Sequence, residues 1–281
     1  MKKILVTGAN GQLGSEFVVL SSQYPQFEWI FADRAKVTLD NLELLKNQLN
    51  EICPNIILNC GAYTTVDKAE TERDLAFTIN HLAVEVIAKY ALQNEIKLIH
   101  FSTDYVFDGL SSTALNEEAK TNPINVYGES KRAGEIACIK ENPDSIIIRT
   151  SWVYSKFGSN FVKTMQCLMQ EREEINVVND QIGSPTYAAD LAQAMMIIIE
   201  SPNWISGIYN YSNEGKISWY EFALAIKELG GYNCNVTGIS SVFYPTPAKR
   251  PRFSLLDKSK MKLIYGLDIP NYKESLKKMF A

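Results

Sequence analysis

"KKILVTGANGQLGSEFVVL", residues 2–20, joins a β-branched apolar run to a second apolar run through a turn that contains three glycines. Gly8, Gly11 and Gly14 are spaced three apart, between the expected strand and the expected helix. Glycine permits a tight turn and lets the backbone approach a pyrophosphate, while the amides of a helix N-terminus face the anion. The stretch therefore predicts a dinucleotide site. Its G-x-x-G-x-x-G spacing departs from the G-x-G-x-x-G fingerprint, and a turn kept only for close helix packing is the alternative.

Short apolar runs recur along the chain and alternate with stretches in which apolar residues follow helical spacing. The expected strands of the first half lie at 2–8, 28–33, 55–62, 97–103 and 145–154. Because such alternation is typical of βαβ units, we expect an α/β fold with a Rossmann-like, doubly wound parallel sheet. One expected helix follows Asp40, which can cap it, and another covers residues 74–94.

The last third of the chain is less regular and contains prolines at 245, 247, 251 and 270. Further strands are expected at 175–181 and 207–213, and helices near 187–200 and 218–229. We therefore expect a discontinuous division of the chain. Residues 1–153 plus about 187–212 would form the dinucleotide-binding Rossmann domain, and about 154–186 plus 213–281 a smaller C-terminal α/β substrate-binding domain.

The bulk composition excludes several classes of protein. The 281 residues carry a net charge of −4 without a long block of Lys or Arg, which argues against a nucleic-acid partner. The apolar run before Gly8 is too short for a signal peptide or a membrane span, so we expect no membrane partner and a cytoplasmic location. Five scattered cysteines without a C-x-x-C pair, and only two histidines, predict no metal site.

Tyr127 and Lys131 lie four residues apart in "NVYGESKRAGE", residues 125–135, which reads as the start of a helix. Positions i and i+4 share a helix face, so the phenol and the ammonium would project side by side. Such a pair can form a proton donor with a charge beside it. An exposed helical pair without a role is the alternative, and these two residues alone favour it.

Three segments of the chain resemble the extended short-chain dehydrogenase/reductase family: the glycine turn, "STDYVFDG" at 102–109 and "YGESK" at 127–131. Further segments resemble the dTDP-4-dehydrorhamnose reductases within it: residues 59–70, 149–154, 179–186 and 244–257. This resemblance implies an NADPH- or NADH-dependent reduction of the 4-keto group of dTDP-4-dehydro-L-rhamnose. The product, dTDP-L-rhamnose, is a precursor of cell-surface polysaccharide.

The resemblance assigns the catalytic roles to Tyr127, Lys131 and Thr103. Tyr127 would donate a proton, and Thr103 would hydrogen-bond the carbonyl oxygen as negative charge builds on it. Lys131 would stabilise the phenolate and contact the nicotinamide ribose. Shifting a phenol from a pKa of ~10 toward ~7 needs roughly 4 kcal/mol, which a charge at ~4 Å in an effective dielectric of ~20 can supply. Asn80 matches a structural asparagine of the wider family, or is a helix-interior residue without a role.

The cofactor site implied by the resemblance surrounds the glycine turn. Its residues are Gly8, Gly11, Gln12, Leu13, Gly14, Asp33, Arg34, Ala62, Tyr63, Thr64, Tyr127 and Lys131, with Thr38 and Leu39 near the adenine. Asp33 ends the second expected strand, where a carboxylate accepts from a ribose hydroxyl and opposes a 2′-phosphate. Its neighbour Arg34 would attract that phosphate. The choice between NADPH and NADH therefore stays open.

The implied substrate site is assembled from segments far apart in the sequence. Its residues are Asp104, Tyr105, Trp152, Gln181 and Arg250, with Ser184, Pro185 and Thr186 shaping the pocket. A charged residue at the carboxyl end of a parallel strand, such as Asp104, lies at the binding edge of the sheet. Trp152 could instead pack in the core. Arg250, with Lys249 and Arg252, could clamp the substrate diphosphate, since their own segment contains no acidic partner; a solvated loop is the alternative.

The sequence departs from the family pattern at one point. Some members form a magnesium-bridged dimer through glutamates, and Glu16 matches one such position. Ala189 stands near the second position and the chain stops before the third. We therefore expect no metal, while a homodimer stays open.

Two other functions compete with the reductase. A regulatory subunit that only holds NADP(H) would not need Thr103, Tyr127 and Lys131 together. A nucleotide-sugar epimerase or dehydratase would show no net oxidation of NAD(P)H. A dehydratase would also place an acid and a base beside the tyrosine, whereas Asp104 is followed by Tyr105 and not by Glu.

Overall fold

The computed structural model describes all residues from Met1 to Ala281 and is built around one six-stranded parallel sheet. The strands are β1 (Lys2–Thr7), β2 (Phe27–Ala32), β3 (Ile56–Asn59), β4 (Lys97–Thr103), β5 (Ile146–Thr150) and β10 (Gly207–Tyr211). Their order across the sheet is β10-β5-β4-β3-β1-β2. The chain runs from β1 to β2 on one side and returns to β3 on the other. Ligands of open parallel sheets bind at such a switch point, beyond the carboxyl ends of the strands.

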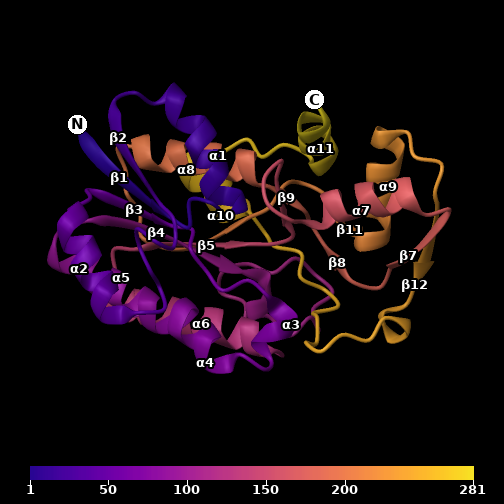
Figure 1. Ribbon diagram of the computed structural model, residues 1–281, viewed down its shortest axis with the longest axis horizontal. Coiled ribbons are helices and arrows are strands. Elements are labelled where there is room, and N and C mark those ends of the chain that lie inside the picture. Colours follow the sequence, from indigo (N-terminus) through magenta and orange to yellow (C-terminus); the bar gives the residue numbers. More distant parts are fainter.

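Helices cover both faces of this sheet (Figure 1). One face carries α1 (Gln12–Leu20), α8 (Ala188–Glu200) and α10 (Ser259–Tyr265), and the other carries α2 (Leu42–Ile52), α5 (Ala83–Gln93) and α6 (Val126–Glu141). Strand side chains alternate between the two layers: Ile4 and Val6 pack with α8, and Leu5 packs with α2 and α5. The expected doubly wound α/β sheet is confirmed.

The helix expected after Asp40 begins one residue later than the sequence suggested. Asn41, not Asp40, caps α2, because its side chain accepts a hydrogen bond from the amide of Leu44. Asp40 lies outside the helix and is bonded to Thr38 and Arg34. The predicted cap was therefore wrong by one position, and the Asp40 carboxylate is left to face the end of β2.

The helix expected at 74–94 is a continuous run made of α4 (Arg73–Phe77), a π-helical turn η2 (Thr78–Leu82) and α5. By length and composition alone, Arg73–Gln93 could cross a membrane. Here Val84, Ile87 and Ala91 are buried in the cluster that packs on the sheet. Core helices pass the same test, so the run is weak evidence for a membrane span.

A smaller unit lies beside the sheet, at the right of Figure 1. It contains α7 (Phe161–Glu171), α9 (Trp219–Gly230), α11 (Tyr272–Phe280) and the parallel pair of β7 (Glu174–Val178) and β12 (Asn235–Ile239). Short strands connect it to the sheet: β6 (Val153–Tyr154), β8 (Ile182–Gly183), β9 (Thr186–Tyr187) and β11 (Ile217–Ser218). Val162, Phe222 and Leu276 belong to its separate apolar core. α10 instead packs on the main sheet through Met261, although the predicted division assigned it to the smaller domain.

Candidate active site

The glycine turn folds tightly against the loop that follows β3. Gly8 has a left-handed backbone (φ +62°), and a Cβ atom there would lie 2.7 Å from the Cα of Gly61. A Cβ atom on Gly14 would lie 2.4 Å from the carbonyl oxygen of Gly8. No side chain caps α1, whose first amides therefore remain available to an anion at the switch point of the sheet.

A cavity of about 400 Å³ opens beside this turn. Several of the expected cofactor residues line it: Gly8, Arg34, Ala62, Tyr63 and Thr64. Val37, Leu39, Leu75 and Ile79 give the same cavity an apolar wall. Such a combination of apolar lining and few polar groups fits the adenosine end of a dinucleotide.

Asp33 and Arg34 follow the end of β2, and Arg34 lines this cavity. One carboxylate oxygen of Asp33 accepts hydrogen bonds from the amides of Ala35 (3.1 Å) and Lys36 (3.0 Å). The side chain of Arg34 is 77% exposed and forms an ion pair with Asp40. The second oxygen of Asp33 makes no protein contact of this kind and can accept from a ribose hydroxyl.

The three expected catalytic side chains come from two neighbouring elements. Thr103 ends β4, and Tyr127 and Lys131 occupy one face of the first turns of α6. Asn125 fixes the start of α6: its side-chain oxygen accepts from the amide of Gly128 (2.7 Å), and its amide nitrogen donates to the Lys249 carbonyl (2.7 Å). The proline-rich segment of the smaller unit therefore helps to position the catalytic helix.

The expected shift of the Tyr127 pKa toward neutrality was wrong. Burial raises the pKa of Tyr127 to about 12, and the Thr103 hydroxyl only partly opposes that rise. Burial also lowers the pKa of Lys131 to about 8. The Lys131 ammonium donates to the Phe101 carbonyl oxygen at 2.6 Å, which satisfies the charge without an ion pair to the phenol. Tyr127 is thus firmly protonated, as a proton donor must be before it reacts.

Asn80 lies in the π-helical turn and links the loop after β3 to α6. Its amide nitrogen donates to the Tyr63 carbonyl and to the Ser130 hydroxyl, both at 3.0 Å. Its oxygen accepts from the Tyr63 amide at 2.9 Å. The side chain therefore has a structural role, and a helix-interior asparagine without a role is the wrong alternative.

The sequence analysis did not predict one polar network, which links the ends of β1, β3 and β4. Thr7 donates to Asn59 (2.7 Å), and Asn59 is hydrogen-bonded to His100 (3.1 Å). The three residues are register partners across β1, β3 and β4. Burial and the nearby Lys131 charge lower the pKa of His100 well below its usual value, so the ring is neutral. A polar residue near the end of each otherwise apolar strand is the signal that could have revealed the network.

The expected substrate residues next to the catalytic group lie close together. Asp104 is buried, one of its oxygens has no hydrogen-bond partner, and burial raises its pKa to about 6. The ring of Tyr105 meets that of Tyr127 edge to face, with 5.5 Å between centroids. Asp104 thus presents an unsatisfied oxygen beside the proton donor, where it can receive a substrate hydroxyl.

Trp152 has a left-handed backbone (φ 49°), which is unusual for a bulky residue. Its indole stacks on Trp219 at 3.7 Å between centroids, and a Cβ atom on Gly183 would lie 2.9 Å from it. The half-buried ring therefore packs against the apolar core of the smaller unit, as the core-packing alternative expected, and its role toward the sugar stays a prediction. Backbone strain of this kind is concentrated at functional sites.

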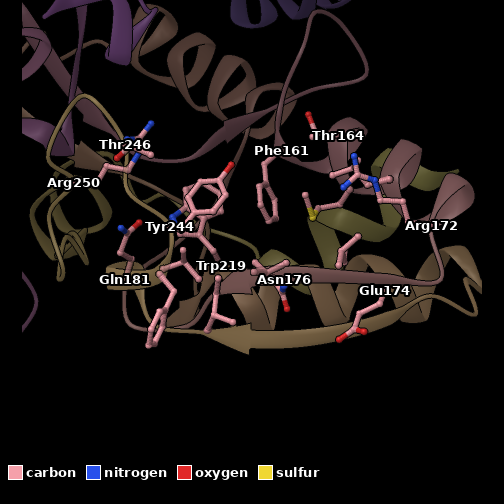
Figure 2. A pocket seen from close by; sticks show the side chains of 17 residues that line it. Phe161, Thr164, Arg172, Glu174, Asn176, Gln181, Trp219, Tyr244, Thr246 and Arg250 are labelled. Carbon is pink, nitrogen blue, oxygen red and sulfur yellow. The ribbon is translucent and has the colours of Figure 1, made fainter.

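A second cavity, of about 580 Å³, lies in the smaller unit and includes Gln181 and Arg250 in its wall (Figure 2). Aromatic residues line it further: Phe161, Trp219, Phe243 and Tyr244. Figure 2 shows Arg250, Thr246 and Gln181 at one end and Arg172 and Glu174 at the other. Stacking surfaces combined with guanidinium groups suit a nucleotide base and its phosphates.

Arg250 has an acidic partner outside its own segment. It makes a two-pronged pair with Asp67 in α3 (Val66–Ala69), at 2.8 and 3.0 Å. The pair joins the smaller unit to the loop after β3. Lys249 and Arg252 are exposed, whereas Ser184 and Thr186 are buried and bond Asn213 and Thr150.

The structure contains no group of three or more His, Cys, Asp or Glu side chains arranged to hold a metal ion. Glu16 is buried, and it accepts a hydrogen bond from Ser155 at 2.6 Å. Burial raises the pKa of this carboxyl. The expectation that no metal binds stays a prediction.

Comparisons with known proteins agree over the whole chain. A family model described as RmlD substrate binding domain matches residues 1–281. A dTDP-4-dehydrorhamnose reductase of Aggregatibacter actinomycetemcomitans is 37% identical, with 100% of this chain and 99% of the relative covered.

Two solved structures are also similar. The dTDP-4-dehydrorhamnose reductase of Bacillus anthracis, in complex with NADP, is 40% identical with a TM-score of 0.94, covering 100% of this chain and 99% of that one. A dTDP-4-dehydrorhamnose reductase of Clostridium acetobutylicum is 38% identical with a TM-score of 0.94, covering 99% and 98%. With its glycine turn and its Thr103, Tyr127 and Lys131 group in place, the chain belongs to the dTDP-4-dehydrorhamnose reductase family.

Proposed function

We propose that this protein uses NADPH or NADH to reduce the 4-keto group of dTDP-4-dehydro-L-rhamnose, giving dTDP-L-rhamnose. One observation carries the proposal: a protonated, half-buried Tyr127 lies with Lys131 on α6, next to Thr103 at the carboxyl end of β4. A protein that only stored a cofactor would gain nothing from a proton donor beside Thr103 and Lys131.

The residues divide the reaction among them. The bound nicotinamide supplies a hydride to the sugar C4. Tyr127 gives its phenolic proton to the oxygen on C4, and Thr103 donates a hydrogen bond to that oxygen as charge develops. The Lys131 ammonium lies on the same helix face and stabilises the tyrosinate that remains, whose proton is then restored from solvent.

The proposed cofactor contacts follow the geometry of the glycine turn. The amides of Gln12, Leu13 and Gly14 at the start of α1 would hold the pyrophosphate. The amide of Gly11 donates to the Gly8 carbonyl at 2.9 Å, so Gly11 would contribute by letting the backbone approach closely. Asp33 would accept from the adenosine ribose, and Ala62, Tyr63 and Thr64 would line the opposite wall. Lys131 would reach the nicotinamide ribose.

The proposed substrate site spans both units of the structure. Asp104, Tyr105 and Trp152 would surround the sugar beside Tyr127, and the cavity with Gln181 and Arg250 would take the nucleotide. In this arrangement the Rossmann unit holds the cofactor and the smaller unit holds the nucleotide part of the substrate, as the predicted domain division requires.

The predicted cytoplasmic location, the absence of nucleic-acid and membrane partners and the homodimer remain part of this proposal. The supporting observations are the small net charge and the relatives that carry out a biosynthetic reduction. Cell fractionation and light scattering of the purified protein test these predictions.

Turnover separates the reductase from its two rivals. Purified protein is mixed with NADPH, or with NADH, and enzymatically prepared dTDP-4-dehydro-L-rhamnose, and both cofactor absorbance and sugar product are followed. Stoichiometric oxidation with dTDP-L-rhamnose formation is expected. A regulatory subunit would bind the cofactor without oxidising it, and an epimerase or dehydratase would change the sugar without net oxidation.

A further inference from the structure

Arg34 and Asp40 form an ion pair at the rim of the cavity assigned to the adenosine end of the cofactor. Both residues line that cavity. The side chain of Arg34 is 77% exposed and that of Asp40 is 27% exposed. The guanidinium is therefore reachable from solvent, but it already faces a carboxylate.

Asp40 is fixed in this orientation by its neighbours. The hydroxyl of Thr38 donates to the second oxygen of Asp40. The Thr38 amide in turn donates to Gln48 in α2 at 3.0 Å, so the segment before the helix is tied down. These two hydrogen bonds, from Thr38 and from Arg34, lower the pKa of Asp40 and keep it ionised near neutral pH.

Asp33, the residue before Arg34 in the sequence, adds a second carboxylate next to this rim. One of its oxygens is bound to the amides of Ala35 and Lys36, which leaves the other for a ribose hydroxyl. NADPH differs from NADH by a phosphate on that ribose. A phosphate entering here would meet two carboxylates and a guanidinium that is already paired.

We propose that Asp40 is a specificity-determining residue for the cofactor. By pairing with Arg34, it weakens the attraction of this rim for a 2′-phosphate and so lowers the affinity for NADPH relative to NADH. The inference rests on the proposed function only in taking this cavity as the adenosine site. Removal of the Asp40 charge frees the Arg34 fork for bidentate contact with a phosphate.

The expected effect is moderate because the pair is partly exposed. Asp40→Asn should tighten binding of a 2′-phosphorylated adenosine about fivefold, which corresponds to about 1 kcal/mol. An adenosine without that phosphate should bind as before. The asparagine keeps the size of the side chain and an oxygen for the Thr38 hydroxyl, so the fold should be retained.

The test uses two probes of the adenosine end, adenosine 2′,5′-bisphosphate and adenosine 5′-monophosphate, each titrated by calorimetry into the full-length protein. The variants are Asp40→Asn, Arg34→Gln and the two combined. Glu43→Gln is the matched control, because it removes one exposed carboxylate from the first turn of α2 without touching Arg34. Dissociation constants of NADPH and NADH, from cofactor fluorescence, complete the series.

The proposal predicts a fivefold tighter bisphosphate complex for Asp40→Asn, an unchanged monophosphate complex and less than a twofold effect of Glu43→Gln. In the Arg34→Gln background, Asp40→Asn should have no selective effect. Three results overturn the proposal. They are an unchanged ratio of the dissociation constants of the two probes in Asp40→Asn, an equal change of that ratio in Glu43→Gln, and a change of that ratio by Asp40→Asn in the Arg34→Gln background. Failure of both probes to bind the wild-type protein would also overturn it. Because turnover with dTDP-4-dehydro-L-rhamnose is measured separately, each of these results can occur with the reductase function intact.

Discussion

Lys131 donates a 2.6 Å hydrogen bond to the carbonyl oxygen of Phe101, and this contact ties the catalytic helix α6 to strand β4 two residues before Thr103. The ammonium is almost fully buried and has no carboxylate on it. Its charge is stabilised by the backbone carbonyl and, at longer range, by Glu135, but burial outweighs both and lowers its pKa to about 8. Both the activity and the stability of the protein should depend on that value.

The ratio kcat/KM should fall above pH 8, because neutral Lys131 no longer supports the tyrosinate or the cofactor ribose. A rate profile from pH 6 to about 10 tests this, since kcat/KM reports the free enzyme. Lys131→Arg stays charged over that range, so any residual activity should lack the alkaline limb. If kcat/KM of Lys131→Arg falls at high pH with the same midpoint as the wild type, another group is responsible for the decrease.

The free energy of unfolding should rise with pH over the range in which kcat/KM falls. The folded pKa lies below the value of about 10.4 for an unfolded lysine, so between the two the unfolded chain binds more protons. Stability from this group therefore rises as the pH increases from 8 toward about 10.4. Lys131→Met should remove that rise, which urea unfolding at several pH values can measure.

Tyr127→Phe should lower kcat by orders of magnitude and leave cofactor affinity nearly unchanged, because the substitution removes the proton donor and keeps the ring. Steady-state kinetics and fluorescence titration of NADPH give the two quantities. Thr103→Val is the companion variant and should act in the same direction. Retention of more than about a tenth of wild-type kcat in Tyr127→Phe would exclude the phenol as the proton donor.

Asp104→Asn should make the protein more stable and less active. Burial raises the pKa of Asp104 to about 6, so the folded state loses stability from this group as the pH rises from about 4 to 6. The neutral amide avoids a penalty of about 2–3 kcal/mol at pH 7. Thermal unfolding at pH 4 and pH 7 should show a gain only at the higher pH, while kcat/KM falls. A gain at both values would indicate a packing effect instead.

Gly14→Ala should weaken both the fold and cofactor binding, because the new methyl group would lie 2.4 Å from the Gly8 carbonyl oxygen and force α1 away from the turn. Gly231→Ala is the control. That glycine also has a positive φ (+65°), but nothing lies within 4 Å of its added Cβ. The control should cost about 1 kcal/mol and leave the NADPH dissociation constant unchanged. Equal effects of the two substitutions on cofactor binding would contradict the close-approach argument.

The strands, the main helices and the glycine turn could be predicted because each is encoded locally, by apolar spacing of two or 3.6 residues and by glycine at a tight turn. Features that depend on partners distant in sequence could not. Asp67 and Arg250 are separated by 183 positions, and the sequence around either residue does not predict their ion pair. Thr7, Asn59 and His100 become neighbours only when the strand register is known.

Two of the wrong predictions have separate physical origins. Asp40 and Asn41 both suit a helix cap, and the local backbone decides between them: Asn41 accepts from Leu44, which leaves Asp40 for Arg34. The predicted direction of the Tyr127 pKa shift was wrong, because a spacing of four residues indicates proximity to Lys131 but gives no measure of burial. Burial has the largest effect on this pKa. To predict the pKa values in a site, the burial of each titratable group must be known as well as its charged neighbours.

Transfer of isotope from the cofactor is a direct test of hydride delivery to C4 of the sugar. NADPH deuterated at C4 of the nicotinamide, on each face in turn, is incubated with the protein and dTDP-4-dehydro-L-rhamnose, and the sugar product is examined by mass spectrometry and proton NMR. One deuterium at C4 of dTDP-L-rhamnose is expected from one of the two labelled forms. Sugar turnover without deuterium at C4 from either form, or with deuterium at another carbon, would exclude hydride delivery to C4.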